Sequence, residues 1–383
     1  MSNKITDIKV YAIKPRWIFI KIITDSGISG WGELVSGTKT DAVVAGAHEM
    51  GRRIIGRNSF EIERIFQELH RSFYRGGPIN ATIISGIEMA LWDIKGKALG
   101  VPVYELLGGK AKDKIKVYSW VGGDRPENVA EEAKKRLDMG FTAIKMNATG
   151  ELHYIDSYKR VEEVVERMAS IREVCGYDLE VGIDFHGRVH KGMAKVMAKE
   201  LEPYHPMFLE EVVLPENEEA FKTVANHTTI PLATGERLYT RWEYKPLFKE
   251  GVIDIIQPDI SLCGGLLEMR KIVAMAEAYD MAVAPHAPYG PINLAASFQV
   301  DACSPNVFIQ EQSLGIHYNR GFDLLDFVKN KEIFEYKNSF VEIPDKPGLG
   351  IEMDEEMIEE IAAEGLHWTN PSWKTYDGSI SEW

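Results

Sequence analysis

The sequence between about residue 115 and about residue 322 alternates between two kinds of segment. Short apolar runs are separated by turns and by longer segments with apolar residues at helical spacing, a pattern typical of alternating strand and helix. Such alternation implies parallel strands joined by right-handed crossovers. Eight units of this kind close into a (β/α)8 barrel of roughly 200 residues. The eight runs are KVYSWV, TAIKMN, EVGIDF, MFLEE, IPLATGE, IDIIQPD, AVAPHA and NVFIQEQ.

The flanking segments have a different texture, which predicts three parts: residues 1–112, 113–322 and 323–383. The first part begins with alternating runs, ITDIKVYAI and WIFIKIITDSGISGWGEL, which predict antiparallel strands with a Ser-Gly turn. Helical patterns follow at about 41–56, 59–76 and 81–100. The last part contains a helical DEEMIEEIAAEG and an irregular tail. We expect it to return to the first part.

Composition narrows the class of protein. The 383 residues are 45% hydrophobic and 27% charged, as in globular enzymes. No apolar stretch approaches the ~18 residues of a membrane span, and MSNKITDIKV has no signal-peptide pattern, so we expect a cytoplasmic protein. The net charge of −14 argues against nucleic-acid binding. Cys175, Cys263 and Cys303 lack metal-site spacing, and we expect them to be buried and reduced.

Polar residues end the apolar runs, and three acids recur at a fixed interval. Asp184, Glu210 and Glu236 are each 26 residues apart, close to one strand-helix unit. Because barrel active sites form at the C-terminal strand ends, these carboxylates should converge. Converging carboxylates repel one another unless a cation lies among them. Oxygen ligands of this kind suit Mg²⁺, with Mn²⁺ as a second possibility.

An alternative explanation is that each acid simply pairs with a basic residue at a strand end. Lys145 and Arg237 are the nearest such residues in the pattern. One acid alone would favour this explanation, whereas three at unit spacing favour a metal site. Glu211 competes with Glu210 for the ligand role, but the 26-residue spacing favours Glu210.

Two histidines accompany the acids. Asp259 ends one run in QPD and His286 lies in the next run, so an Asp–His pair across neighbouring strands is expected, in which the Asp orients the imidazole as a base. A lone His286 would more often be a core residue. His186 lies two residues after Asp184 and therefore points the same way. It is a candidate acid, or else a partner of a metal ligand.

These residues and their surrounding motifs resemble the enolase superfamily, in its mandelate racemase-like branch. The resemblance runs nearly end to end. It is carried by GWGE, FYRGGP, ALWDIKGKALG, YSWVGGDRP, KMN, GIDFHGRVH, FLEE, GERLY, DIIQPD, GGLLE, HAPYGPI, IQEQSLGIHYN and DGSISEW.

The resemblance implies a barrel with an α+β capping domain, formed by the N-terminal region and the C-terminal tail. It further implies Mg²⁺-dependent dehydration of a sugar acid, with D-galactonate as the first expected substrate and gluconate or arabinonate as alternatives. We also expect a small-molecule substrate, no membrane partner and a homo-oligomer. The roles it implies are metal ligation by Asp184, Glu210 and Glu236, a base formed by His286 with Asp259, a general acid in His186, a hydrogen bond near the enolate from Glu311, and substrate binding by Lys145, Asn147 and Arg237.

Some neighbours depart from the family pattern and leave the exact sugar acid open. They are Leu34, Val212, Ala287, Tyr289 and the segment around Trp17. We place specificity in segments 16–26 and 73–78 and in the residues near His286. Two other classes compete: a sugar-acid epimerase and a binder without catalysis. An epimerase with a KxK motif has a second titratable group, whereas this chain reads Lys145-Met146-Asn147, and Asn cannot titrate.

Overall fold

The computed structural model describes residues 3–37, 39–72, 74, 77–366 and 368–382. Its N-terminal part is an antiparallel sheet covered by helices, as the alternating and helical patterns predicted. Helix α3 lies close to strand β3 because two glycines meet there: a Cβ on Gly32 would lie 1.9 Å from the carbonyl oxygen of Gly86. The elements are β1 (Ile5–Ile13), β2 (Trp17–Thr24), β3 (Ser29–Val35), α1 (Thr40–Ile54), α2 (Ile62–Arg71), α3 (Gly77–Leu99) and α4 (Val103–Leu106).

The central part is the predicted barrel. Strands β4 to β10 pair in parallel in chain order, β11 pairs with β4, and a parallel bridge between Val283 and Val307 closes the ring. All eight apolar runs form the expected strands. They are β4 (Lys114–Val121), β5 (Ala143–Asn147), β6 (Glu180–Asp184), β7 (Phe208–Glu210), β8 (Leu232–Thr234), β9 (Ile255–Ile256), β10 (Ala282–Val283) and β11 (Gln310–Glu311).

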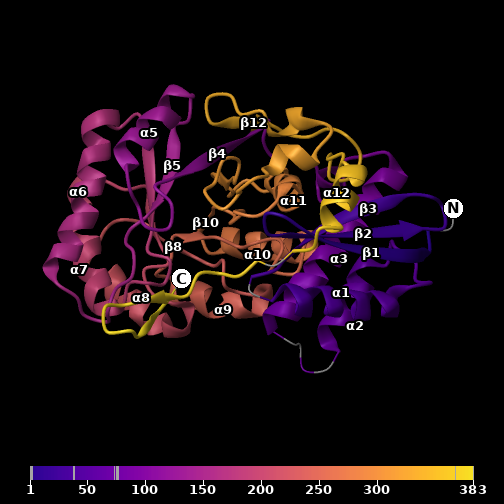
Figure 1. Ribbon diagram of the computed structural model, residues 1–383, viewed down its shortest axis with the longest axis horizontal. Coiled ribbons are helices and arrows are strands. Elements are labelled where there is room, and N and C mark those ends of the chain that lie inside the picture. Colours follow the sequence, from indigo (N-terminus) through magenta and orange to yellow (C-terminus); the bar gives the residue numbers. More distant parts are fainter. Residues whose placement is uncertain (1–2, 38, 73, 75–76, 367, 383) are drawn as a thin grey trace.

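Helices between the strands cover the outside of the barrel (Figure 1). Inside the barrel, the rings of Tyr118 and Phe208 meet at 6.4 Å. Gly182 makes room for them, since a Cβ there would lie 2.5 Å from the Phe208 ring. The helices are α5 (Val129–Asp138), α6 (Tyr158–Cys175), α7 (Lys191–Leu201), α8 (Glu218–Ala225), α9 (Thr240–Glu250), α10 (Leu266–Ala278) and α11 (Pro291–Ala302).

The C-terminal residues contact both parts of the molecule. Strand β12 (Phe340–Glu342) pairs with β4, and α12 (Glu355–Ala362) packs on β1, where Glu359 accepts a hydrogen bond from Tyr11 at 3.0 Å. The chain then crosses to the barrel, where β13 (Trp373–Lys374) pairs with β14 (Ile380–Ser381). The domain boundaries at 112 and 322 stay predictions.

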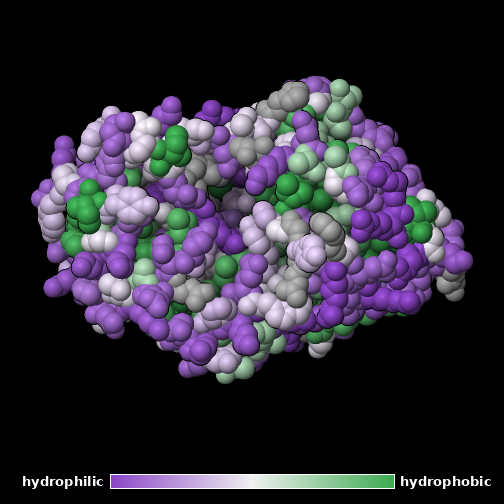
Figure 2. Space-filling model, turned by 90° about the horizontal axis from the view of Figure 1, so that it is seen from below, coloured by the Kyte–Doolittle hydropathy of each residue, from purple (hydrophilic) through white to green (hydrophobic). Residues whose placement is uncertain are grey.

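Seen from below, the surface is largely hydrophilic and is hollowed between its two halves (Figure 2). The three cysteines are buried and free, as expected. Among the described helices, we find none with the length and apolar character that crossing a bilayer requires.

Candidate active site

The three acids predicted as metal ligands lie together at the C-terminal ends of consecutive strands. The strand register pairs Asp184 of β6 with Glu210 of β7, and Glu210 with Ala233 of β8, three residues before Glu236. One carboxylate oxygen from each acid lies within 4.8 Å of the other two. Their residues are only 1%, 0% and 8% exposed, so the negative charges share a poorly solvated space.

Glu210 has the basic partner that the alternative explanation required. The ammonium group of Lys145 lies 2.7 Å from Glu210 Oε1 and 3.1 Å from Glu311 Oε1. The side-chain amide of Gln257 donates to Glu210 Oε2 at 2.6 Å. Lys145 thus links Glu210 to Glu311 and fixes the position of Glu210.

Asp184 and Glu236 form no ion pair with a lysine or arginine among the described residues. Asp184 Oδ1 accepts the backbone N–H of His186 at 2.7 Å, whereas Glu236 Oε2 is buried and accepts no hydrogen bond from any described residue. Burial, together with the charge of Glu210 for Asp184 and of Glu211 for Glu236, raises the pKa of both carboxyls well above the usual range. A divalent cation fits here, because oxygen ligands suit Mg²⁺ and its charge would offset the repulsion.

His286 and Asp259 form the predicted pair. A parallel bridge joins the two residues, and His286 Nδ1 lies 2.7 Å from Asp259 Oδ2. The other ring nitrogen, Nε2, lies 3.6 Å from Glu236 Oε2, beside the acid cluster. Burial alone would lower the pKa of His286, but the charge of Glu311 and the hydrogen bond to Asp259 outweigh burial and raise it. The imidazole is therefore oriented with Nε2 toward the acids.

His186 follows β6 in a left-handed backbone conformation, with φ of 53°. A non-glycine residue in this region is unusual and often marks a functional position. Its ring lines the same cavity as His286. Burial, with the charges of Arg188 and Arg237 nearby, holds the pKa of His186 well below the usual range. A negative charge brought beside the ring would favour its imidazolium form.

The remaining predicted residues occupy different surroundings. Asn147 lines the cavity and donates to the carbonyl of Gly123 at 3.2 Å. Arg237 also lines it, but its guanidinium is held by Glu211 at 2.8 Å and by Glu382 at 2.9 Å. Glu211 thus pairs with Arg237, while Glu210 joins the acid cluster. The substrate-binding roles of Lys145, Asn147 and Arg237 stay predictions.

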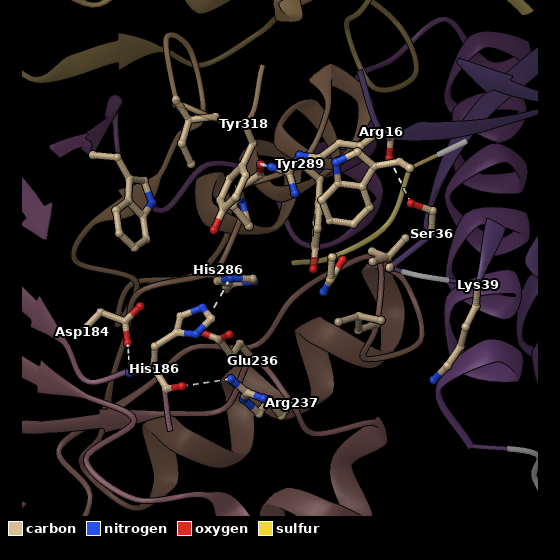
Figure 3. A pocket seen from close by; sticks show the side chains of 18 of the residues that line it. Arg16, Ser36, Lys39, Asp184, His186, Glu236, Arg237, His286, Tyr289 and Tyr318 are labelled. Carbon is tan, nitrogen blue, oxygen red and sulfur yellow. Dashed lines mark hydrogen bonds and ion pairs between the residues drawn. The ribbon is translucent and has the colours of Figure 1, made fainter. Parts of the chain in front are cut away.

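A cavity of about 430 Å³ connects these groups to the N-terminal part. Figure 3 shows Asp184, His186 and Glu236 on one side and Arg16 and Ser36 on the other, with Tyr289 and Tyr318 between them. Sequence reasoning missed several groups. Gln257 had a detectable signal, since it precedes Asp259 by two residues in the same run. The missed lining residues that lie outside the barrel strands and follow no periodic pattern include Ser36, Gly37, Lys39, Trp368, Asn370 and Glu382.

Of the predicted specificity segments, 16–26 reaches the cavity through Arg16. Arg16 is 5% exposed and lies over the rings of Tyr318 at 4.6 Å and Tyr289 at 5.4 Å. It forms no ion pair with any acid in the described part of the chain. In segment 73–78, residues 73, 75 and 76 lie outside the described residues, and Gly77 lines a separate small cavity.

A barrel with three acids at consecutive strand ends and an Asp–His pair beside them defines a class of enzyme that removes protons next to carboxylates. Two family models agree: residues 11–108 match the mandelate racemase/muconate lactonizing enzyme N-terminal domain, and residues 128–357 match the enolase C-terminal domain-like family. The chain belongs to the enolase superfamily, in its mandelate racemase/muconate lactonizing enzyme family.

Similar proteins cover the whole chain. D-galactonate dehydratases from Variovorax paradoxus and Pectobacterium atrosepticum are 49% and 50% identical over 99% of this chain and 100% of their own. A crystal structure of an enolase from Agrobacterium radiobacter, with Na and L-malate bound, has a TM-score of 0.90 at 30% identity and covers 99% of this chain and 100% of that one. An enolase superfamily member from Salmonella Typhimurium has a TM-score of 0.85 at 32% identity, over 93% of this chain and 98% of that one.

Proposed function

We propose that this chain is a metal-dependent sugar-acid dehydratase that converts D-galactonate to 2-dehydro-3-deoxy-D-galactonate and water. The reaction type rests on one observation: a buried acid cluster and an Asp–His pair lie side by side at one cavity. D-galactonate comes from the relatives at 49–50% identity. A soluble enzyme acting as a homo-oligomer in the cytoplasm is part of the same proposal.

Asp184, Glu210 and Glu236 would hold the cation, with Mg²⁺ expected and Mn²⁺ as a substitute. Such a cation stabilises the negative charge that develops on a carboxylate when the neighbouring proton leaves. Lys145 holds Glu210 in place through its 2.7 Å contact, and Gln257 holds the second oxygen. The acid cluster thereby sets where the substrate carboxylate would lie.

His286 removes the proton next to the carboxylate through Nε2, because Nδ1 is engaged by Asp259. Asp259 stabilises the imidazolium that forms. His186, from a strand four steps away around the barrel, gives its proton to the departing β-hydroxyl, which leaves as water. The resulting enol becomes the 2-keto acid. Glu311, held by Lys145 and by the backbone N–H of Ala287 at 2.8 Å, lies near the developing charge.

The epimerase alternative is disfavoured by Asn147, since a neutral amide at this strand end cannot exchange protons on the second face of the substrate carbon. A screen of stereoisomeric aldonates and aldarates for 2-keto-3-deoxy products tests the proposal. We expect D-galactonate to react best. Turnover of another aldonate alone would retain the reaction and change the substrate, whereas racemised or unchanged acids throughout the screen would overturn the dehydratase proposal.

A further inference from the structure

Glu33, the acid of the GWGE motif, lies in the N-terminal part of the chain but has its hydrogen-bond partners in the barrel. The residue is 0% exposed and lies on β3. Its carboxylate accepts backbone N–H groups of Gly290 at 2.5 Å, Asn293 at 3.0 Å and Ile292 at 3.2 Å. These are the first N–H groups of α11, which have no partner within the helix itself. Glu33 therefore fixes the start of α11 from outside the barrel.

The start of α11 is joined to the proposed base. Asn293, in the first turn, donates its side-chain amide to Asp259 Oδ1 at 3.2 Å and to Ser261 Oγ at 2.8 Å. The other oxygen of Asp259 is the one that holds His286. Gly290 allows the close approach, because a Cβ there would lie 2.6 Å from Glu33 Oε1. A continuous chain of contacts thus runs from Glu33 through Asn293 to His286.

We propose that Glu33 is a positioning residue: by anchoring the first turn of α11, it places Asn293 so that Asp259 and His286 are held in the geometry for proton removal. The N-terminal sheet thereby determines the position of the base as well as enclosing the substrate. This inference rests on the proposed role of His286 and Asp259.

Glu88 provides a matched control. It is also buried, lies on α3 and accepts the backbone N–H groups of Leu266 at 2.7 Å and Leu267 at 3.0 Å, at the start of α10. The acid in the first turn of α10, Glu268, bonds to Arg241 instead of the Asp–His pair. Glu33 and Glu88 therefore anchor barrel helices in the same way, but among the described residues the side-chain path through Asn293 to Asp259 and His286 starts from the helix that Glu33 anchors.

The experiment compares Glu33→Gln with Glu88→Gln in the intact enzyme. Both substitutions should lower the melting temperature by a similar few degrees, because each leaves one acceptor oxygen where two oxygens accepted the N–H groups at the start of a helix. Only Glu33→Gln should lower kcat, by roughly 10-fold or more, since small displacements of a base are costly. KM should change by less than about 2-fold, and the ¹⁵N-histidine signal of His286, assigned from its loss in His286→Asn, should shift in Glu33→Gln alone.

Equal effects of the two substitutions on kcat and on the His286 signal would overturn the inference, as would an unchanged signal in Glu33→Gln. If Glu33→Gln does not fold, Asn293→Ala tests the same connection, because it leaves the contacts of Glu33 with the backbone in place. Asn293→Ala should lower kcat and shift the His286 signal. If both kcat and the His286 signal stay unchanged, the proposal is overturned. The histidine signal can be measured without turnover. If the wild-type enzyme does not dehydrate the sugar acid, the proposed function is rejected, but the signal still tests whether Glu33 positions His286.

Discussion

At the scale of single residues, the site depends on which buried acids have a basic partner. The spacing of Asp184, Glu210 and Glu236 was readable from the sequence because strand ends meet at one edge of a barrel. Their partners were not, since Lys145 reaches Glu210 from two strands before it and Gln257 reaches it from two strands after it. The excess of unpaired negative charge became visible only in the structure.

Substituting Gln257 tests how strongly the residues that hydrogen-bond to the acid cluster support metal binding. We expect Gln257→Leu to weaken Mn²⁺ binding roughly 10- to 100-fold, because Glu210 loses the donor that orients it. Gln299, which is equally buried and bonds to Tyr104 and Leu349 instead, provides the control: Gln299→Leu should leave Mn²⁺ affinity unchanged. Calorimetric titration with Mn²⁺ measures both, and equal affinities in the two variants would refute the role of Gln257.

Isotope exchange should distinguish the roles of His186 and His286. His286→Asn should abolish both dehydration and exchange of the substrate α-proton with deuterated solvent, because the base is lost. His186→Asn should block dehydration yet leave slow exchange, since proton removal by His286 is intact. Proton NMR of the recovered substrate measures the exchange. The opposite pattern would reverse the assigned roles.

Asp301, near the end of α11, offers a test of stability against pH. Both carboxylate oxygens are buried and accept no hydrogen bond from any described residue, and burial, partly offset by the charge of Lys112, raises its pKa from 3.8 to about 8. Between those pH values the folded protein keeps a proton that the unfolded chain releases, so the free energy of unfolding falls as pH rises.

In Asp301→Asn, this fall in the free energy of unfolding with rising pH should disappear, because an amide does not ionise. We expect the variant to exceed the wild type in unfolding free energy by about 1–3 kcal/mol at pH 8 and by less at pH 5. Urea unfolding at both pH values measures the difference. A gain that is the same at both values would show that Asp301 does not titrate in this range.

At the scale of elements, strands and helices followed from periodicity, whereas the C-terminal tail did not. Its path depends on single contacts: the guanidinium groups of Arg188 and Arg125 lie 4.2 Å and 4.6 Å from the centre of the Trp373 ring. Nearby tail residues Trp368 and Glu382 line the active-site cavity. Pairing between distant side chains leaves no local pattern, so the sequence could not place these residues.

Trp373→Ala should release the tail from the cavity. We expect KM for the sugar acid to rise roughly 10-fold, equivalent to about 1.4 kcal/mol, because two cation–π contacts are lost. Ile380, on the same hairpin and 71% exposed, supplies the control, and Ile380→Ala should leave KM unchanged. Steady-state kinetics decide, and an unchanged KM in Trp373→Ala would mean that the tail does not help to bind substrate.

At the scale of the whole molecule, the barrel and the N-terminal part both contribute residues to the lining of one cavity. The repeated units predicted the barrel because each strand end contributes to a common edge. Contacts between the two parts, such as Glu33 at α11, were hidden because a buried acid in a strand gives no sign of the helix that it anchors.

The central claim is that a divalent cation, the acid cluster and His286 together remove the substrate α-proton and water. The most direct test follows D-galactonate by NMR in deuterated solvent, with Mg²⁺ present and after removal of metal by a chelator. We predict formation of 2-dehydro-3-deoxy-D-galactonate only with the metal, and recovery when Mg²⁺ is restored. Undiminished product formation by the metal-free enzyme would contradict the account.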